Sequence, residues 1–147
     1  MNDKIVLDSC VFSKQFLEES DSYQANALIE RLIINKVDIL VPSLFIYEVL
    51  ATVNIGNYPV NEVYELITDF KKTQLHTIEL DEKHIAKTLE ICEAGHIKSG
   101  FPSFYDACYH ALAIIHDCHF ITADKKHFHK TQHLGHIALL NDWKTAY

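Results

Sequence analysis

The sequence predicts an α/β fold in which helices cover both faces of a parallel sheet of four to five strands. Short apolar runs of strand type alternate along the chain with longer segments of helical periodicity. The chain has 147 residues, and no segment rich in Pro, Gly or Ser divides it. We therefore expect residues 1–147 to form a single domain that is long enough to bury a substantial core.

Short apolar runs mark the predicted strands. Four are distinct, and a fifth near the C-terminus is weaker. They are Ile5–Leu7, Asp38–Val41, Leu75–Leu80 and His119–Thr122, followed by Ile137–Leu140. Their alternation with helical segments favours parallel pairing, because parallel strands need a long crossover connection.

Five segments between these runs predict helices. They are Ser22–Ile34, Ser43–Val53, Asn61–Phe70, Asp81–Ala94 and Ser103–His116. In the first of them Leu28, Ile29 and Leu32 have the spacing of one helical face. Asp81 is a typical N-cap, and Gly95 follows the same segment where a helix would end.

The overall charge argues against a broad surface for nucleic acid or anionic lipid. The formal net charge is −7, and Arg31 is the sole arginine. This balance still allows a local basic rim, or a bound metal that attracts phosphate. Contacts to phosphate would then fall mainly to lysines.

Cysteine usage and hydropathy predict a cytoplasmic protein without a membrane span. The four cysteines form no C-x-x-C pair, and the first residues lack the apolar core of a secretory signal. No apolar stretch approaches the roughly 18 residues that suggest a membrane span. We therefore expect reduced, mostly buried thiols.

Four acidic residues fall where the predicted fold would bring them to one edge of the sheet. Asp8 directly follows the first predicted strand, and Asp124 stands two residues after the fourth. Asp106 lies in the first turn of the helix that precedes the fourth strand, and such a helix starts where that strand ends. Glu48 lies in the second turn of its helix, and its long side chain can lean back over the same edge.

Each acid also has a plain structural explanation. Asp8 can cap a helix, Asp124 can begin a turn, and Ser103 with Asp106 fits a capping box. A glutamate inside a helix usually faces solvent, although the neighbours of Glu48 are nearly all apolar. One shared site explains all four positions at once, and we favour it for that reason.

A shared acidic site predicts a bound metal. Carboxylates at close range repel one another unless a cation lies between them, and all-oxygen ligands favour hard ions such as Mg²⁺ or Mn²⁺. Two such ions about 3.5–4 Å apart activate a water molecule and stabilise the leaving oxygen of a phosphodiester. Ions of this kind would also draw RNA or DNA phosphates onto an acidic protein.

Short motifs in a fixed order make the chain similar to the PIN-domain nucleases. They are LDS at 7–9, YEV at 47–49, FYDA at 104–107 with ALA at 111–113, and TAD at 122–124. Each motif is short, but their order and spacing extend over nearly the whole chain. The resemblance implies a sheet order of 3-2-1-4-5, metal-dependent cleavage of RNA and, in many members, a homodimer.

The resemblance also implies roles for individual residues. It makes Asp8, Glu48, Asp106 and Asp124 the catalytic, metal-binding acids, with Mg²⁺ or Mn²⁺ as cofactor. Ser9 matches the small hydroxyl residue that helps to orient the first acid or a water molecule. Many small members are VapC-type toxins paired with an antitoxin, and others act in RNA processing. Both roles stay open for this chain.

Self-association is expected chiefly from the same resemblance. The apolar helices after Val41 and Pro59 carry Phe45 and Tyr64 as candidates for an exposed contact surface. Either residue suits the core equally well, so the sequence leaves that choice open.

A histidine-rich segment, 127–136, lies outside the family motifs. With residues just upstream it allows a transition-metal site, although the spacing matches no tight zinc pattern. The residues concerned are His127, His129, His133 and His136, with His116, Cys118 and His119. We favour surface histidines beside an RNA path, where Lys125, Lys126 and Lys130 form a basic rim that contacts RNA.

Two other functional classes stay open. A phosphatase- or dehalogenase-like hydrolase also has an aspartate nucleophile after its first strand, but usually a second acid two residues later. This chain has Cys10 at that position. The other alternative is a PIN-like fold kept as a catalytically inactive module that binds RNA or protein. The presence of all four acids favours an enzyme.

Overall fold

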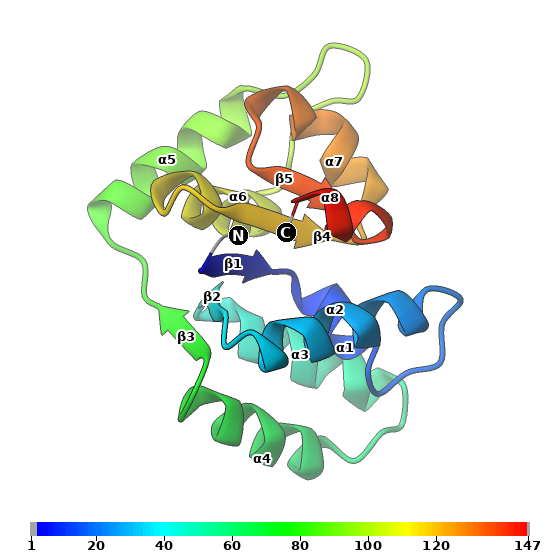
Figure 1. Cartoon of the computed structure of the whole chain (residues 1–147). Helices are drawn as coiled ribbons and strands as arrows, with labels where there is room; N and C mark the ends of the chain where they lie inside the picture. Colours follow the sequence, from blue (N-terminus) through cyan, green and yellow to red (C-terminus); the bar gives the residue numbers. More distant parts are fainter. Residues whose placement is uncertain (1–2, 147) are drawn as a thin grey trace.

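The computed structural model describes residues 3–146 and contains a five-stranded sheet in the order β3-β2-β1-β4-β5 (Figure 1). Every neighbouring pair of strands is parallel. The strands are β1 (Lys4–Leu7), β2 (Asp38–Pro42), β3 (Leu75–Ile78), β4 (His119–Thr122) and β5 (Ile137–Leu139). The predicted fold class and the implied order are therefore confirmed, and the fifth strand exists.

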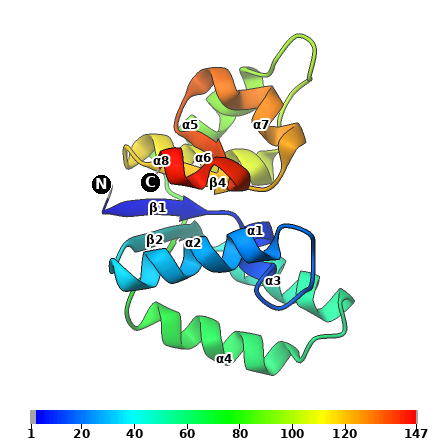
Figure 2. The same ribbon diagram turned by 45° about the vertical axis from the view of Figure 1, so that its right-hand side comes forward.

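Helices flank this sheet. They are α1 (Ser9–Ser13), α2 (Ser22–Ile34), α3 (Leu44–Ile55), α4 (Val60–Lys71), α5 (Glu82–Glu93), α6 (Phe104–Ile115), α7 (Lys125–Thr131) and α8 (Trp143–Ala146), with short 3-10 turns η1 (Gln132–Leu134) and η2 (Leu140–Asp142). Helix α6 packs against the three central strands, β1, β2 and β4, and α5 packs on α6. Both ribbon views place α1–α4 on one side of β1 and α5–α8 on the other (Figures 1 and 2).

The differences from the predicted elements have local causes. The predicted strand Leu75–Leu80 ends at Ile78, because its partner β2 ends at Pro42, the last residue in register with it. Three helices were not predicted: α1, α7 and α8. Each has seven residues or fewer, so none is long enough to display a helical repeat of apolar residues.

Aromatic rings fill much of the core between the sheet and α1, α3 and α4. Phe12 lies 5.3 Å from Phe45, edge to face, and 6.1 Å from Phe70, measured between ring centroids. Phe45 is completely buried, so of the two roles that the sequence left open for it, the structure shows the core. Tyr64 is 54% exposed and stays a candidate for an exposed contact surface.

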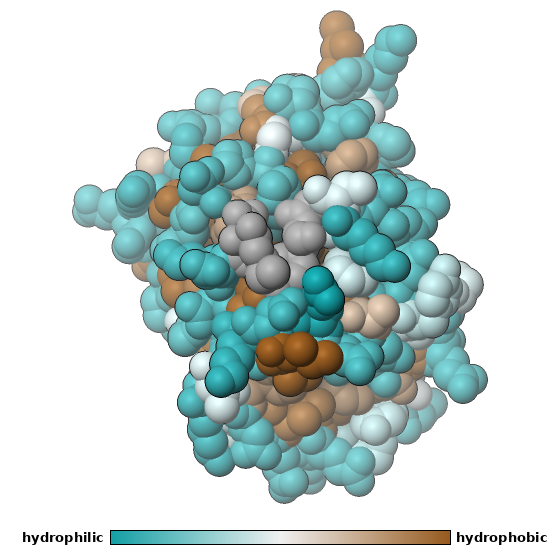
Figure 3. Space-filling model, viewed as in Figure 1, coloured by the Kyte–Doolittle hydropathy of each residue, from teal (hydrophilic) through white to brown (hydrophobic). Residues whose placement is uncertain are grey.

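The face of the molecule in Figure 3 is mainly hydrophilic, with an apolar patch between α2 and α4. Ile33, Leu66 and Phe70 help to line a pocket there. Within residues 3–146, no helix combines the length and the apolar character that crossing a membrane requires.

Candidate metal centre

The four acids come from four separate parts of the fold that meet beyond the carboxyl edge of the sheet. Asp8 lies between β1 and α1, and Asp124 lies between β4 and α7. Glu48 lies on α3, and Asp106 lies in the first turn of α6. Because the strands are parallel, the ends of β1 and β4 lie side by side, with Leu7 in register with Ile121.

Asp8 is the most deeply buried of the four acids, with 5% of its surface exposed. The Thr122 hydroxyl donates a hydrogen bond of 2.6 Å to Asp8 Oδ2. Burial raises the pKa of Asp8 to about 6, and the negative charges of Asp106 and Glu48 act in the same direction. The folded protein therefore disfavours the charged form of Asp8 more than the unfolded chain does, and a bound cation would stabilise that charged form.

Thr122 links Asp8 to the second strand end. Its hydroxyl accepts a 3.0 Å hydrogen bond from the backbone N–H of Asp124 while it donates to Asp8. The carboxylate of Asp124 in turn accepts hydrogen bonds from the backbone N–H groups of Lys126 and His127 at the start of α7. The hydroxyl thus fixes the relative positions of two acids that are far apart in the sequence.

Glu48 is half-buried and is held by two hydroxyl groups. The Tyr109 hydroxyl donates to Glu48 Oε1 at 2.6 Å, and Ser9 Oγ lies 3.3 Å from the same oxygen. Burial raises the pKa of Glu48, and the charge of Asp106 adds to that rise, whereas the two hydroxyl contacts lower it. Ser9 also lies 3.4 Å from Asp8 Oδ1, so it bridges two of the acids.

Asp106 is partly buried and is bonded twice to Ser103, the N-cap residue of α6. Its backbone N–H donates to Ser103 Oγ at 3.2 Å, and that hydroxyl donates to Asp106 Oδ2 at 3.1 Å. Burial raises the pKa of Asp106, and the charge of Asp124 raises it further, whereas Lys130 lowers it. Asp106 therefore faces both another acid and a lysine of the predicted basic rim.

The donor set suits a hard divalent cation. All four groups supply carboxylate oxygens, and within the described residues none of them forms an ion pair with a lysine or arginine. The side chains as they stand do not enclose a coordination sphere, because within residues 3–146 no group of three or more His, Cys, Asp or Glu is close enough to hold an ion. Uncompensated charge and oxygen chemistry fit Mg²⁺ or Mn²⁺.

Three of the four acids also have helix-capping contacts. Asp8 accepts a long, 3.5 Å hydrogen bond from the backbone N–H of Cys10 at the start of α1. Asp124 caps α7, and Asp106 supports Ser103, the N-cap of α6, by accepting a hydrogen bond from its hydroxyl. Capping uses only some of the carboxylate lone pairs, so it does not compete with cation binding.

A model of the PIN domain family matches residues 5–134. The chain belongs to the PIN domain family. No curated protein matches the chain in sequence. The predicted family is thus confirmed, and the described geometry is that of a PIN domain.

Solved structures share the fold at low sequence identity. FitAcB from Neisseria gonorrhoeae is 20% identical, with 95% of this chain and 98% of that chain covered and a TM-score of 0.67. A VapBC2 pair from Rickettsia felis, bound to a DNA fragment of its promoter, is 17% identical, with 92% and 96% covered and a TM-score of 0.65. The Mycobacterium tuberculosis toxin VapC20, which cleaves the sarcin–ricin loop, is 12% identical, with 90% and 95% covered and a TM-score of 0.65. At these identities the likeness concerns the fold.

The histidines of this PIN domain do not behave as a surface group. His129 and His133 are exposed, but His127 is 2% exposed and packs edge-on against His110, with 5.7 Å between ring centroids. The proposed set of seven transition-metal ligands is not assembled within residues 3–146. The interpretation as surface histidines was therefore wrong for His127, which belongs to the core.

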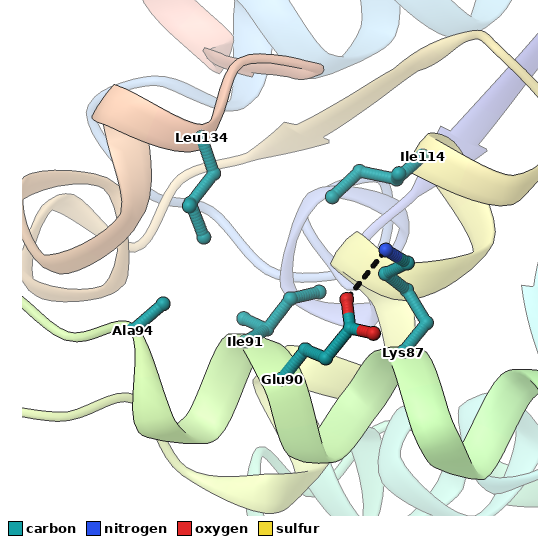
Figure 4. A pocket seen from close by; sticks show the side chains of 6 residues that line it. All are labelled: Lys87, Glu90, Ile91, Ala94, Ile114 and Leu134. Atoms are coloured by element: carbon teal, nitrogen blue, oxygen red, sulfur yellow. Dashed lines mark hydrogen bonds and ion pairs between the residues drawn. The ribbon is translucent and has the colours of Figure 1, made fainter.

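Figure 4 shows from close by a second pocket of the PIN domain, of about 260 Å³. It is formed by α5, α6 and η1 and is mainly apolar, with Ile91, Ile114 and Leu134 among its lining residues. Lys87 and Glu90 form an ion pair beside it. None of the four acids lines this pocket.

Tyr109 was missed when the sequence was considered alone, and Thr122 was noted only as part of a motif. Both hydroxyls hold acids of the PIN domain, and both residues are buried. One weak signal was available for Tyr109, because it lies three residues after Asp106 and so on a neighbouring face of the same helix. Only the tertiary structure shows that this face meets Glu48.

We expect Asp8→Asn to stabilise the metal-free PIN domain by about 1 kcal/mol at neutral pH. The folded-state pKa of about 6 lies above the ordinary pKa of 3.8 for an aspartate, so Asp8 favours folding at low pH and loses that contribution as the pH rises through about 6. Asparagine keeps the acceptor for Thr122 without the charge. Urea melts with EDTA at neutral pH and near pH 4 measure the gain, which should vanish at the lower pH.

Mn²⁺ should then raise the melting temperature of the wild type more than that of Asp8→Asn. Asp38→Asn is the matched control, because Asp38 is half-buried at the opposite edge of the sheet and contacts His76. That control should respond to Mn²⁺ as the wild type does. Equal melting temperatures and equal metal responses for Asp8→Asn and wild type would assign Asp8 a capping role only.

Proposed function

We propose that this PIN domain is a ribonuclease that depends on Mg²⁺ or Mn²⁺ and acts as the toxin of a toxin–antitoxin pair. The observation that carries the proposal is the set of acids at one edge of the sheet, whose charges no described lysine or arginine offsets through an ion pair. The negative charges within the set act on one another. Asp106 and Glu48 raise the pKa of Asp8, Asp106 raises that of Glu48, and Asp124 raises that of Asp106. The carboxylates of such a cluster repel one another, and a bound divalent cation reduces that repulsion.

In this proposal Asp8, Glu48, Asp106 and Asp124 hold the cation. A bound Mg²⁺ or Mn²⁺ supplies a Lewis acid that activates water and stabilises the leaving oxygen of the phosphodiester. The chain itself orients the acids, through Thr122 on Asp8 and the hydroxyls of Tyr109 and Ser9 on Glu48.

The basic rim supplies contacts to the RNA backbone. Lys130 acts on the pKa of Asp106, which puts its charge within electrostatic reach of the acids. Lys125 and Lys126 lie in the first turn of α7 and are exposed. Phosphates of a bound strand would reach these lysines beside the site, although the net charge of −7 keeps general affinity for nucleic acid low.

The purified protein should cleave unstructured RNA only when Mg²⁺ or Mn²⁺ is present. EDTA should stop the reaction, and excess Mn²⁺ should restore it, because the acids alone supply neither a Lewis acid nor a water of lowered pKa. Gel analysis of a labelled RNA measures cleavage. A module that only binds RNA would shift the RNA without cutting it, and an aspartyl-phosphate on the protein would instead favour the phosphatase alternative.

The toxin role rests on the partners of similar structures. FitAcB, FitAB and VapBC2 have this fold, and the Klebsiella pneumoniae structure of the same fold is described as a toxin–antitoxin complex. We propose an antitoxin partner and a homodimer for this chain as well. Production of the chain in a bacterium should arrest growth, and sedimentation at micromolar concentration should give the mass of two chains.

A further inference from the structure

A buried tyrosine reaches across the fold to one of the proposed metal ligands. Tyr109 lies on α6 and is 1% exposed, and its hydroxyl donates to Glu48 Oε1 on α3 across 2.6 Å. The two residues are 61 positions apart in the sequence. This contact is one of the two shortest side-chain hydrogen bonds to the four acids, together with that from Thr122 to Asp8.

The other hydroxyl beside Glu48 cannot replace this anchor. Ser9 carries one hydroxyl proton, and its oxygen lies 3.3 Å from Glu48 Oε1 and 3.4 Å from Asp8 Oδ1. A single proton serves only one of these acceptors at a time, and both distances are long for a hydrogen bond between oxygens. Tyr109 therefore provides the firm contact. Both donors meet at Oε1, which leaves Oε2 as the oxygen available to a cation.

The ring of Tyr109 is itself fixed. It stacks on Phe120 of β4 with 5.5 Å between centroids and 12° between planes. Phe120 lies beside Ile121 and Thr122, so the strand that supports the ring also supplies the hydroxyl that holds Asp8. A rigid ring delivers its hydroxyl to one place, which restricts the rotamers open to Glu48.

We propose that Tyr109 is a positioning residue that holds Glu48 ready for a divalent cation and thereby sets the affinity of the acidic site. The inference rests on the proposed function, because it assumes that Glu48 binds the cation. Partners that hold metal ligands in place typically change metal affinity by about 10- to 100-fold when removed. Tyr109 does not touch the cation in this scheme.

Tyr109→Phe tests the proposal, because it removes only the hydroxyl and keeps the stacked ring. Electron paramagnetic resonance of free Mn²⁺ gives the dissociation constant, which should rise by about 10- to 100-fold in the variant. Thermal melts in EDTA check that the variant stays folded. Tyr58→Phe is the matched control, because Tyr58 packs on Phe16 and makes no described hydrogen bond to the acids. It should bind Mn²⁺ as the wild type does.

A double-mutant cycle with Glu48→Gln isolates the route of the effect. If the hydroxyl acts through the Glu48 carboxylate, Tyr109→Phe should change Mn²⁺ affinity much less in the Glu48→Gln background than in the wild type. An undiminished effect there would overturn the positioning role, as would unchanged Mn²⁺ affinity in folded Tyr109→Phe. Failure of the wild type to bind Mn²⁺ at all would instead remove the proposed metal site, and this inference with it.

Discussion

Asp106→Asn should lower RNA cleavage by more than about 100-fold while the protein stays folded. Residues that merely support a metal ligand change activity by about 10- to 100-fold, and loss of a charged ligand should exceed that range. Asparagine keeps an oxygen that accepts from the Ser103 hydroxyl, so the Ser103 cap at the start of α6 survives. Single-turnover cleavage with saturating Mn²⁺, together with a thermal melt, measures both effects.

Asp81→Asn is the matched control for this experiment. Asp81 caps α5 by accepting a 2.8 Å hydrogen bond from the backbone N–H of His84. Asp81→Asn removes the same charge at the start of a helix, and RNA cleavage by this variant should stay near the wild-type rate. Wild-type cleavage by folded Asp106→Asn would mean that Asp106 only caps its helix and has no catalytic part.

Acid should destabilise the protein through two buried histidines. Burial lowers the pKa of both His110 and His127 to about 4, from 6.5. Unfolded chains take up these protons below about pH 6.5, whereas the folded protein resists them until about pH 4. The stabilising contribution of the neutral rings is therefore complete above about pH 6.5 and is lost as the pH falls. At pH 5 each should lower the free energy of unfolding by about 2 kcal/mol.

Asp8 opposes part of this loss. Its pKa is raised to about 6 on folding, so its protonation favours the folded state by about 1 kcal/mol at pH 5. Burial also raises the pKa values of Glu48 and Asp106, which oppose the loss in the same way, and lowers those of His116 and His119, which add to it. We expect the buried histidines to dominate, so the free energy of unfolding should fall between pH 7 and pH 5. Urea unfolding in EDTA at the two pH values measures this difference.

His127→Phe is the decisive variant for the acid effect. Within residues 3–146 neither ring nitrogen of His127 has a hydrogen-bond partner, and the ring packs among His110 and Phe120. Phenylalanine keeps these ring contacts and cannot take up a proton. The variant should lose about 2 kcal/mol less than the wild type on acidification. His129→Gln, an exposed change on the same helix, should behave as the wild type, and a wild-type acid response from His127→Phe would reject this explanation.

The longer elements could be predicted because their signals are local. The helix Ser22–Ile34 has the predicted bounds, and β4 matches the predicted strand at both ends. The short helices α1 and α7 depend on caps that look identical in sequence to turns. The end of β3 depends on where its neighbour stops, which a single run of residues does not contain.

The sequence allowed us to predict which strand ends and helices carry the site, but not the side-chain contacts within it. Asp8 and Asp124 could be placed together because both follow parallel strands, and the structure puts those strand ends side by side. The contact of Tyr109 with Glu48 depends on how α6 meets α3, which no spacing encodes. The burial of His127 was missed for a related reason, since a histidine among lysines looks like surface until its face is known.

The pairing of β1 with β4 also decides when the acidic cluster comes into being during synthesis. Asp8 leaves the ribosome long before Thr122, which is 114 positions further along the chain. Until β4 emerges, β1 lacks its neighbour on one edge, and the carboxylate of Asp8 stays hydrated. The acidic cluster is therefore incomplete until residue 124 has been translated, because Asp124 and the Thr122 hydroxyl that holds Asp8 both lie at the end of β4.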